Sequence, residues 1–301
     1  MAEPVRDRWA EWLLERRHGG DPEDLKSTLD FLIPVRDRVL RNAALTGGEI
    51  LLDVGAGDGL VAFGALEIVG EGGRVPFSDI SQDLLYHSRS LARQMGVLDR
   101  CEFVHASADD LSALEDASLD VVTTRSVLIY VKDKQRAFEE FHRVLKPGGR
   151  LSIFEPINNF TYPEPPHLFG GSDVTPMADL AERVKAVYAS RQPPEESPML
   201  DFDERDLFDL AERAGFEEIH LSYEAKTKPG NLEVDARDWE TALRSAPNPF
   251  APTLGQALVE ALTSEEKERF VAHLRPLVET GKRRSRDAVA YLWTVKREEA
   301  S

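Results

Sequence analysis

Residues 49–155 alternate between short β-rich runs and stretches of helical spacing, and this order constrains the fold more than any other feature of the chain. The β-rich runs are EILLDV, RVPFSDI, CEFVHA, LDVVTTR and RLSIFEP. Strands that alternate with crossovers predict a mostly parallel sheet with helices on both faces. Two later runs, EEIHLSYEAKT and RDAVAYLWTVKRE, also read as strands. We therefore expect an α/β fold with a doubly wound, seven-stranded, mostly parallel sheet.

The segment before this core predicts helices. Its spacing places Val5, Trp9, Trp12 and Leu13 on one helical face. The pair Asp21-Pro22 signals the start of a second helix, and Pro34 signals the start of a third.

Two segments that follow the core predict further covers. Residues 156–199 hold eight of the chain's 18 prolines, which argues against regular strands and is typical of a lid. A helix is expected near residues 177–190, and residues 231–280 again have helical spacing. The predicted divisions are an N-terminal helical cover (1–46), a core (47–155), a lid and acceptor region (156–202), a continuation of the core (203–229), a helical cap insertion (230–285) and a terminal core strand with a tail (286–301).

Charge and composition argue against several classes of protein. The 37 basic and 54 acidic side chains give a net charge of −17, which disfavours a nucleic-acid partner, and the short basic run at 282–286 reads as solvated surface. A single cysteine and scattered histidines predict neither a disulfide framework nor a metal site. The chain has no run of about 18 apolar residues and no secretory pattern at its start, so we expect a cytoplasmic protein without a membrane span.

The run LLDVGAGDG places three glycines directly after a predicted strand. A dinucleotide-binding loop has its third glycine three residues after the second, whereas Gly55, Gly57 and Gly59 are spaced by two. Asp53 would repel a pyrophosphate but attract a sulfonium or ammonium group. Asp79 follows the loop by 20 residues, at the end of a predicted strand, which suits a carboxylate that binds ribose hydroxyls. The alternatives are glycines that only permit a tight turn, and acids that only cap helices or lie on the surface.

With these motifs the chain resembles the class I S-adenosylmethionine-dependent methyltransferases, in particular the small-molecule branch that includes quinone-ring methyltransferases. The resemblance covers about residues 49–155 and resumes at 203–226. It rests on LLDVGAGDG, FSDIS, FVHASADDL, the segment from RSVLIY to the Lys-Pro-Gly-Gly turn, and FDERDLFDLAERAGFEEI. It implies a Rossmann-like fold and S-adenosylmethionine as cofactor.

The resemblance also implies which residues bind the cofactor. The glycine turn would pass under its methionine part, Asp79 would bind the ribose hydroxyls, and Ile80 would lie against adenine. Ser107 stands where the family often has an acid. The residues expected at the cofactor are Asp53, Gly55, Ala56, Gly57, Gly59, Asp79, Ile80, Ser107, Ala108, Asp109 and Arg125. Arg125 either lines the methyl end through its backbone or is an exposed loop residue.

Three residues are candidates for catalysis. Tyr130 either points its hydroxyl into the acceptor pocket or packs in the core or at the rim, and Glu155 either positions the acceptor or caps the following segment. His167, with Tyr162 nearby, is an acid–base candidate in the lid, or else a surface histidine. Trp239 and Phe250 are expected in the core of the cap.

We therefore predict an enzyme that methylates a small molecule by in-line transfer. Long covers over the strand ends indicate an enclosed acceptor, and the protein is expected to be a monomer or a homodimer. The alternatives are a nucleotide-dependent oxidoreductase and a non-catalytic S-adenosylmethionine-binding protein.

Overall fold

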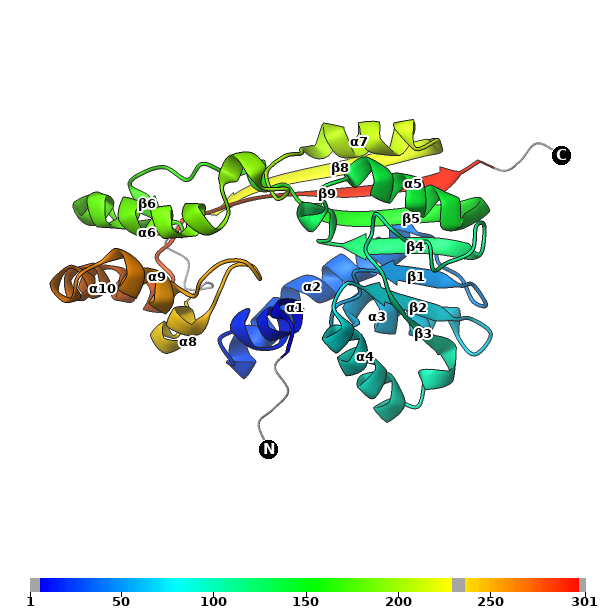
Figure 1. Cartoon of the computed structure of the whole chain (residues 1–301), viewed down its shortest axis with the longest axis horizontal. Helices are drawn as coiled ribbons and strands as arrows, with labels where there is room; N and C mark the ends of the chain where they lie inside the picture. Colours follow the sequence, from blue (N-terminus) through cyan, green and yellow to red (C-terminus); the bar gives the residue numbers. More distant parts are fainter. Residues whose placement is uncertain (1–5, 229–235, 298–301) are drawn as a thin grey trace.

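A seven-stranded sheet forms the core of the chain in the computed structural model, which describes residues 6–228 and 236–297 (Figure 1). The strand order is β3-β2-β1-β4-β5-β9-β8. The strands are β1 (Leu51–Val54), β2 (Val75–Asp79), β3 (Cys101–His105), β4 (Leu119–Arg125), β5 (Leu145–Pro156), β8 (Phe216–Lys228) and β9 (Ser285–Lys296). Strands β1 to β5 are parallel, and β9 runs antiparallel to both β5 and β8. The predicted doubly wound α/β fold is confirmed.

Helices cover both faces of this sheet. On one face, α2 (Pro22–Asn42), α3 (Leu60–Val69) and α4 (Gln82–Gln94) share a hydrophobic cluster with β1 and β2. On the other face, α5 (Lys134–Val144) and α7 (Glu204–Arg213) share a second cluster with β4, β5 and β9. The strands between them are buried on both sides, as their apolar composition predicts.

Helix α2 begins where the sequence predicts, but Pro34 does not start a third helix. Asp21 caps α2 by accepting a hydrogen bond from the backbone N–H of Glu23, and Pro22 occupies the first turn. Pro34 lies inside the same helix. A proline in a helix interior costs about 3 kcal/mol. Burial of Val35, Val39 and Leu40 against the core offsets that cost and lets the helix continue past Pro34.

The cap is a single hydrophobic unit built from two separate chain segments. Helix α6 (Ala178–Arg191) packs with α8 (Trp239–Arg244), α9 (Leu254–Ala261) and α10 (Ser264–Glu279) around one cluster. The long strands β8 and β9 lead from the core to this cap, which Figure 1 shows at the end opposite the C-terminus. The expected helix near 177–190 is confirmed, and Trp239 is buried in the cap as predicted. The expectation of no regular strand before α6 is wrong at one hairpin, β6 (Leu168–Phe169) with β7 (Ser172–Asp173), because Gly170 and Gly171 allow a tight turn.

The remaining elements are short. They are α1 (Arg8–Glu11), the π-helical turn η1 (Trp12–Arg16) and the 3₁₀ turns η2 (Leu98–Arg100), η3 (Leu128–Tyr130), η4 (Asn158–Phe160), η5 (Thr175–Met177) and η6 (Pro194–Glu196). Val5 and the predicted boundary at residues 229–230 lie outside the described residues. None of the helices in the described ranges combines the length and apolar character that a membrane crossing requires.

The N-terminal segment, residues 6–20, connects the core to the cap. On the core side, Asp7 caps α1 and accepts a hydrogen bond from Ser81 Oγ at 2.7 Å. On the cap side, the backbone N–H of Ala246 donates to the carbonyl of Arg16 at 2.9 Å. Trp12 Nε1 donates to the carbonyl of Ala246, also at 2.9 Å. These contacts place the segment between the strand ends and the cap.

Candidate active site

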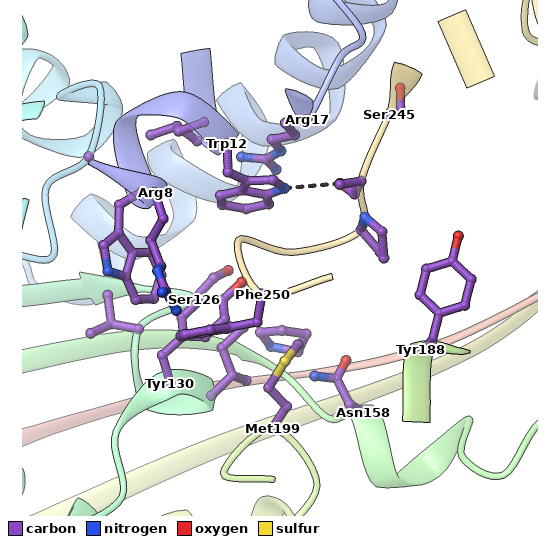
Figure 2. Close-up of a pocket in the computed structure, with 18 of the residues that line it drawn as sticks. Arg8, Trp12, Arg17, Ser126, Tyr130, Asn158, Tyr188, Met199, Ser245 and Phe250 are labelled. Carbon is purple, nitrogen blue, oxygen red and sulfur yellow. Dashed lines mark hydrogen bonds between the residues drawn. The ribbon is translucent and has the colours of Figure 1, made fainter. Parts of the chain in front are cut away.

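A cavity of about 1220 Å³ lies where the N-terminal segment and the cap meet the carboxyl ends of the parallel strands. Pockets for one drug-sized molecule measure roughly 300–1,000 Å³, so this cavity has room for two ligands side by side. Figure 2 shows Trp12 and Arg17 on one wall, Ser126 and Tyr130 on a second, and Met199, Asn158 and Tyr188 on a third. Ligands of open α/β sheets bind at this edge of the sheet.

The glycine turn after β1 brings its backbone to the cavity wall. Gly55 and Gly57 line the cavity and have φ angles of +64° and +57°. A Cβ atom on Gly55 would lie 2.4 Å from Val127 Cγ2, and one on Gly57 would lie 3.0 Å from Leu13 Cδ2. Gly59, with φ +85°, caps α3 instead and packs against Phe63, away from the cavity. All three glycines therefore allow a side chain to pack against the turn, and the backbone of the first two also lines the cavity.

Asp79 ties the glycine turn to the end of β2. Its Oδ2 accepts a hydrogen bond from the Gly57 N–H and its Oδ1 accepts one from the Ser81 N–H, both at 2.8 Å. The side chain is 7% exposed and borders the cavity. A carboxylate has about four acceptor positions, so Asp79 keeps acceptor capacity for a ligand. Burial raises the pKa of Asp79 above its ordinary value, and the two backbone N–H groups oppose that rise.

The cavity extends from Asp79 to the ends of β2 and β3. Ile80 is 45% exposed at this end of the cavity and offers an apolar surface to a flat ring. Ser107, Ala108 and Asp109 line the same end, and Ser107 Oγ donates to Asp109 Oδ1 at 2.5 Å. A polar pair next to an apolar face suits a heterocycle with hydrogen-bonding edges.

Besides Gly59, two residues expected at the cofactor lie outside the cavity lining. Asp53 is 2% exposed, and its carboxylate accepts hydrogen bonds from the Ala62 N–H in the first turn of α3 and from Thr123 Oγ1. Burial raises the pKa of Asp53 to about 7. Asp53 therefore supports the glycine turn from below and does not face a ligand, so the predicted contact with a cationic group is wrong. Ala56 is also buried, and its N–H donates to the carbonyl of Ser78.

Of the three candidate catalytic residues, only Tyr130 lines the cavity. Glu155 is fully buried, and its carboxylate accepts hydrogen bonds from the N–H groups of Val127, Leu128 and Ile129 at 2.8, 2.9 and 3.3 Å. Glu155 therefore caps the η3 turn, which precedes it in the sequence, and these contacts match neither predicted role, positioning of the acceptor or capping of the segment that follows Glu155. His167 is exposed beside the β6–β7 hairpin and does not reach the cavity.

Arg125 and Tyr130 flank the turn that leaves β4. Both line the cavity, together with Ser126, whose φ angle is +57°. The Ser126 N–H donates to the carbonyl of Phe154 at 2.8 Å, which holds this unusual backbone conformation. Burial raises the pKa of the Tyr130 hydroxyl above its ordinary value, so this hydroxyl keeps its proton at neutral pH.

Sequence reasoning missed the side chains that cover the cavity. The N-terminal segment contributes Trp9, Trp12 and Arg17 to the lining. Phe250, predicted as cap core, is 38% exposed and lines the cavity, because it follows α8 at the edge of the cap rather than inside its cluster. The closely spaced tryptophans on one predicted helical face were the available signal. Within residues 6–228 and 236–297, no three His, Cys, Asp or Glu side chains are grouped to hold a metal ion.

Comparisons with known proteins agree with this geometry. Residues 52–153 match the family model described as "Methyltransferase domain". The ubiquinone/menaquinone biosynthesis C-methyltransferase UbiE of Klebsiella pneumoniae is 37% identical over 108 residues, which are 36% of this chain and 43% of that protein, and UbiE of Escherichia coli gives the same figures. The chain thus spans less than half the length of these curated relatives.

Solved structures match over more of the chain. One match is a candidate methyltransferase from Bacillus halodurans, which is 20% identical and superposes with a TM-score of 0.51. The alignment covers 87% of this chain and 98% of the other. The YcgJ protein of Bacillus subtilis is 16% identical, covers 88% of this chain and 98% of its own, and has a TM-score of 0.53. At these identities the likeness concerns the fold alone.

Proposed function

We propose that this chain, whose residues 52–153 match the methyltransferase-domain model, transfers a methyl group from S-adenosylmethionine to a small-molecule acceptor. One observation carries the proposal. A single cavity joins a cofactor-like end, around Gly57, Asp79 and Ile80, to an end lined by Tyr130 and the covering segments. Its volume of about 1220 Å³ suits a cofactor and a small acceptor together.

The residues at the first end fit S-adenosylmethionine. The remaining acceptor positions of Asp79 would bind the ribose hydroxyls, and the apolar surface of Ile80 would lie against adenine. The exposed backbone of Gly55 and Gly57 would pass under the methionine part. The spacing of Gly55, Gly57 and Gly59 by two residues differs from the dinucleotide fingerprint, in which the third glycine follows the second by three, and so disfavours a dinucleotide.

For methyl transfer, the protein mainly has to align the acceptor with the methyl group and exclude water. The cofactor supplies a methyl group on a sulfonium, which is displaced in line by a nucleophilic atom of the acceptor. The N-terminal segment and the cap meet over the strand ends at the hydrogen bond between Trp12 and Ala246, which would limit the access of water to that line. Tyr130, which keeps its proton, can orient the acceptor by hydrogen bonding. Glu155 holds the Tyr130 turn through three backbone contacts and acts on the acceptor only through that turn.

Product formation tests this proposal. The protein is incubated with S-adenosylmethionine and a small-molecule cell extract, and S-adenosylhomocysteine is quantified by mass spectrometry. We expect S-adenosylhomocysteine to form in proportion to protein, with one extract component gaining the mass of a methylene unit. The Asp79→Ala variant should lose most of this activity.

Two results would contradict the proposal. Binding of S-adenosylmethionine without any product above the protein-free control would favour a non-catalytic binding protein. Binding of a nicotinamide dinucleotide instead would favour an oxidoreductase.

A further inference from the structure

The cavity wall is cationic although the chain as a whole is acidic. The net charge of the chain is −17. The acidic side chains in the lining are Asp79, Asp109 and Glu164. The basic ones are Arg8, Arg17, Arg125, Lys132, Lys185, Arg237 and Arg283. A wall of this sign inside an acidic protein favours an anionic ligand.

The basic groups of the lining differ in whether the protein already pairs them, and Arg8 lies over the ring of Phe250, 5.3 Å from its centroid. Arg237 is paired with Asp24, and Lys185 contacts Glu164. By contrast, Arg17 and Arg125 have no ion pair or hydrogen bond of their guanidinium groups within the described ranges.

Arg17 and Arg125 line the same cavity, and the charge of Arg125 acts on Arg17. Burial, and after it the charge of Arg125, lowers the pKa of Arg17. Asp58 and Asp24 oppose that effect from a distance, without forming an ion pair with Arg17. Two cations that repel each other in a half-buried wall gain most from an anion placed between them.

Next to this pair lies an aromatic wall. The ring of Trp9 meets the rings of Tyr130 and Phe250 edge to face, with centroids 4.9 and 5.5 Å apart. Met199 borders the same space, as Figure 2 shows. Aromatic edges and a thioether form a surface that accepts a flat ring.

The cofactor does not bring net negative charge to this cationic wall. S-adenosylmethionine carries one carboxylate against an ammonium and a sulfonium, so it enters the cavity as a net cation. Because the cofactor adds net positive charge to a lining that already has more basic than acidic side chains, this cavity favours an anionic acceptor.

We infer that the acceptor is a flat aromatic molecule with an anionic oxygen, which lies between Arg17 and Arg125 while the ring rests on Trp9, Tyr130 and Phe250. This inference rests on the proposed function and names the acceptor class for it. A carboxylate bound by a guanidinium gains charge-assisted and often bidentate hydrogen bonds, which a neutral amide does not gain.

Calorimetry with matched probes tests the inference. Protein saturated with S-adenosylhomocysteine is titrated with 1-naphthoate and with 1-naphthamide, which share a ring and differ in charge. We expect the naphthoate to bind at least tenfold more tightly than the amide. The preference should fall about tenfold in Arg17→Gln and, separately, in Arg125→Gln. The exposed Arg205, on α7 and outside the cavity, provides the matched control Arg205→Gln, which should keep the full preference.

A second set of titrations shows whether Arg17 and Arg125 bind the anion of the acceptor or the carboxylate of the cofactor. Each variant is also titrated with S-adenosylhomocysteine and with methylthioadenosine, which lacks the amino-acid tail. If Arg17→Gln and Arg125→Gln weaken only S-adenosylhomocysteine and leave the naphthoate preference intact, the pair binds the cofactor's carboxylate and the inference is overturned, while the proposed function stands. Equal binding of the two naphthyl probes, or no binding of either, also overturns it. A wild-type chain that binds no S-adenosylhomocysteine overturns the proposed function itself.

Discussion

Asp79 accepts hydrogen bonds from Gly57 and Ser81 while its carboxylate borders the cavity. A hydrogen bond to a charged group contributes about 1.5–3 kcal/mol. Asp79→Ala should therefore weaken the binding of S-adenosylhomocysteine more than tenfold, and Asp79→Asn, which keeps one acceptor oxygen, should weaken it less. Titration calorimetry measures both affinities. Asp99→Ala, an exposed acid far from the cavity lining, is the control. An unchanged affinity in Asp79→Ala would show that the ribose assignment is wrong.

Three acids stand at or near strand ends, and their positions in the sequence do not separate their roles. Asp53, Asp79 and Glu155 each follow an apolar run. In the structure only Asp79 reaches the cavity, because the partners of the other two lie within the protein. Asp53 bonds to the start of α3 and to Thr123, and Glu155 bonds to the η3 turn. These partners come from other elements, so residue spacing alone does not reveal them.

Glu155 gives the protein a pH dependence of known sign. Burial raises its pKa to about 7 from an ordinary 4.5. Between these values the folded state holds a proton that the unfolded state has lost, so the free energy of unfolding falls as the pH rises through this window. Glu155→Gln cannot ionise. We expect the stability lost between about pH 5 and pH 7.5 to be smaller in this variant, by about 1–3 kcal/mol. Urea unfolding at both pH values measures the difference, and parallel losses in the two proteins would contradict it.

At the scale of elements, the turn after β1 depends on the absence of a side chain at Gly55. Gly55→Ala has two costs in folding stability. The left-handed backbone conformation costs a residue with a Cβ atom about 1–2 kcal/mol, and the clash of that atom with Val127 costs about 1–3 kcal/mol. We expect a loss of about 2–5 kcal/mol in unfolding free energy. Gly96 has a similar φ of +71° but nothing within 4 Å of an added Cβ, so Gly96→Ala should lose only the first part. Equal losses in chemical denaturation would show that the clash with Val127 is relieved.

The elements of the core could be predicted because local spacing encodes them. Strands such as β1 and β4 are short apolar runs between turn residues, and α4 and α5 each have one buried face. The continuation of α2 through Pro34 could not be predicted, because it depends on what Val35 and Val39 pack against. The β6–β7 hairpin is two residues long on each side and leaves no periodicity to detect.

At the scale of the whole molecule, the cap is one unit although its helices come from two distant segments. Val184 of α6 and Phe270 of α10 belong to one hydrophobic cluster. Local spacing predicts each helix but not which distant helix it packs against, so the lid and the insertion were predicted as separate covers. The N-terminal segment then closes the space between this cap and the core.

This arrangement predicts that a ligand in the cavity orders the covers. Binding of S-adenosylhomocysteine should slow hydrogen exchange in residues 8–17 and in residues 239–250, because both segments line the cavity and bond to each other. Helix α7 provides an internal control, since none of its residues lines the cavity. Hydrogen-exchange mass spectrometry with and without the ligand measures the change. Protection confined to the glycine turn and β2 would mean that the covers move independently of the cofactor.

The ligand-binding predictions above depend on one property of the cavity, which is that it binds the nucleoside of a sulfonium cofactor and not a dinucleotide. Isothermal titration calorimetry of the wild-type protein, with S-adenosylhomocysteine and with NAD in parallel, measures this most directly. The account predicts saturable heat with one S-adenosylhomocysteine per chain and no saturation with NAD. Saturation with NAD and no heat from S-adenosylhomocysteine would contradict it.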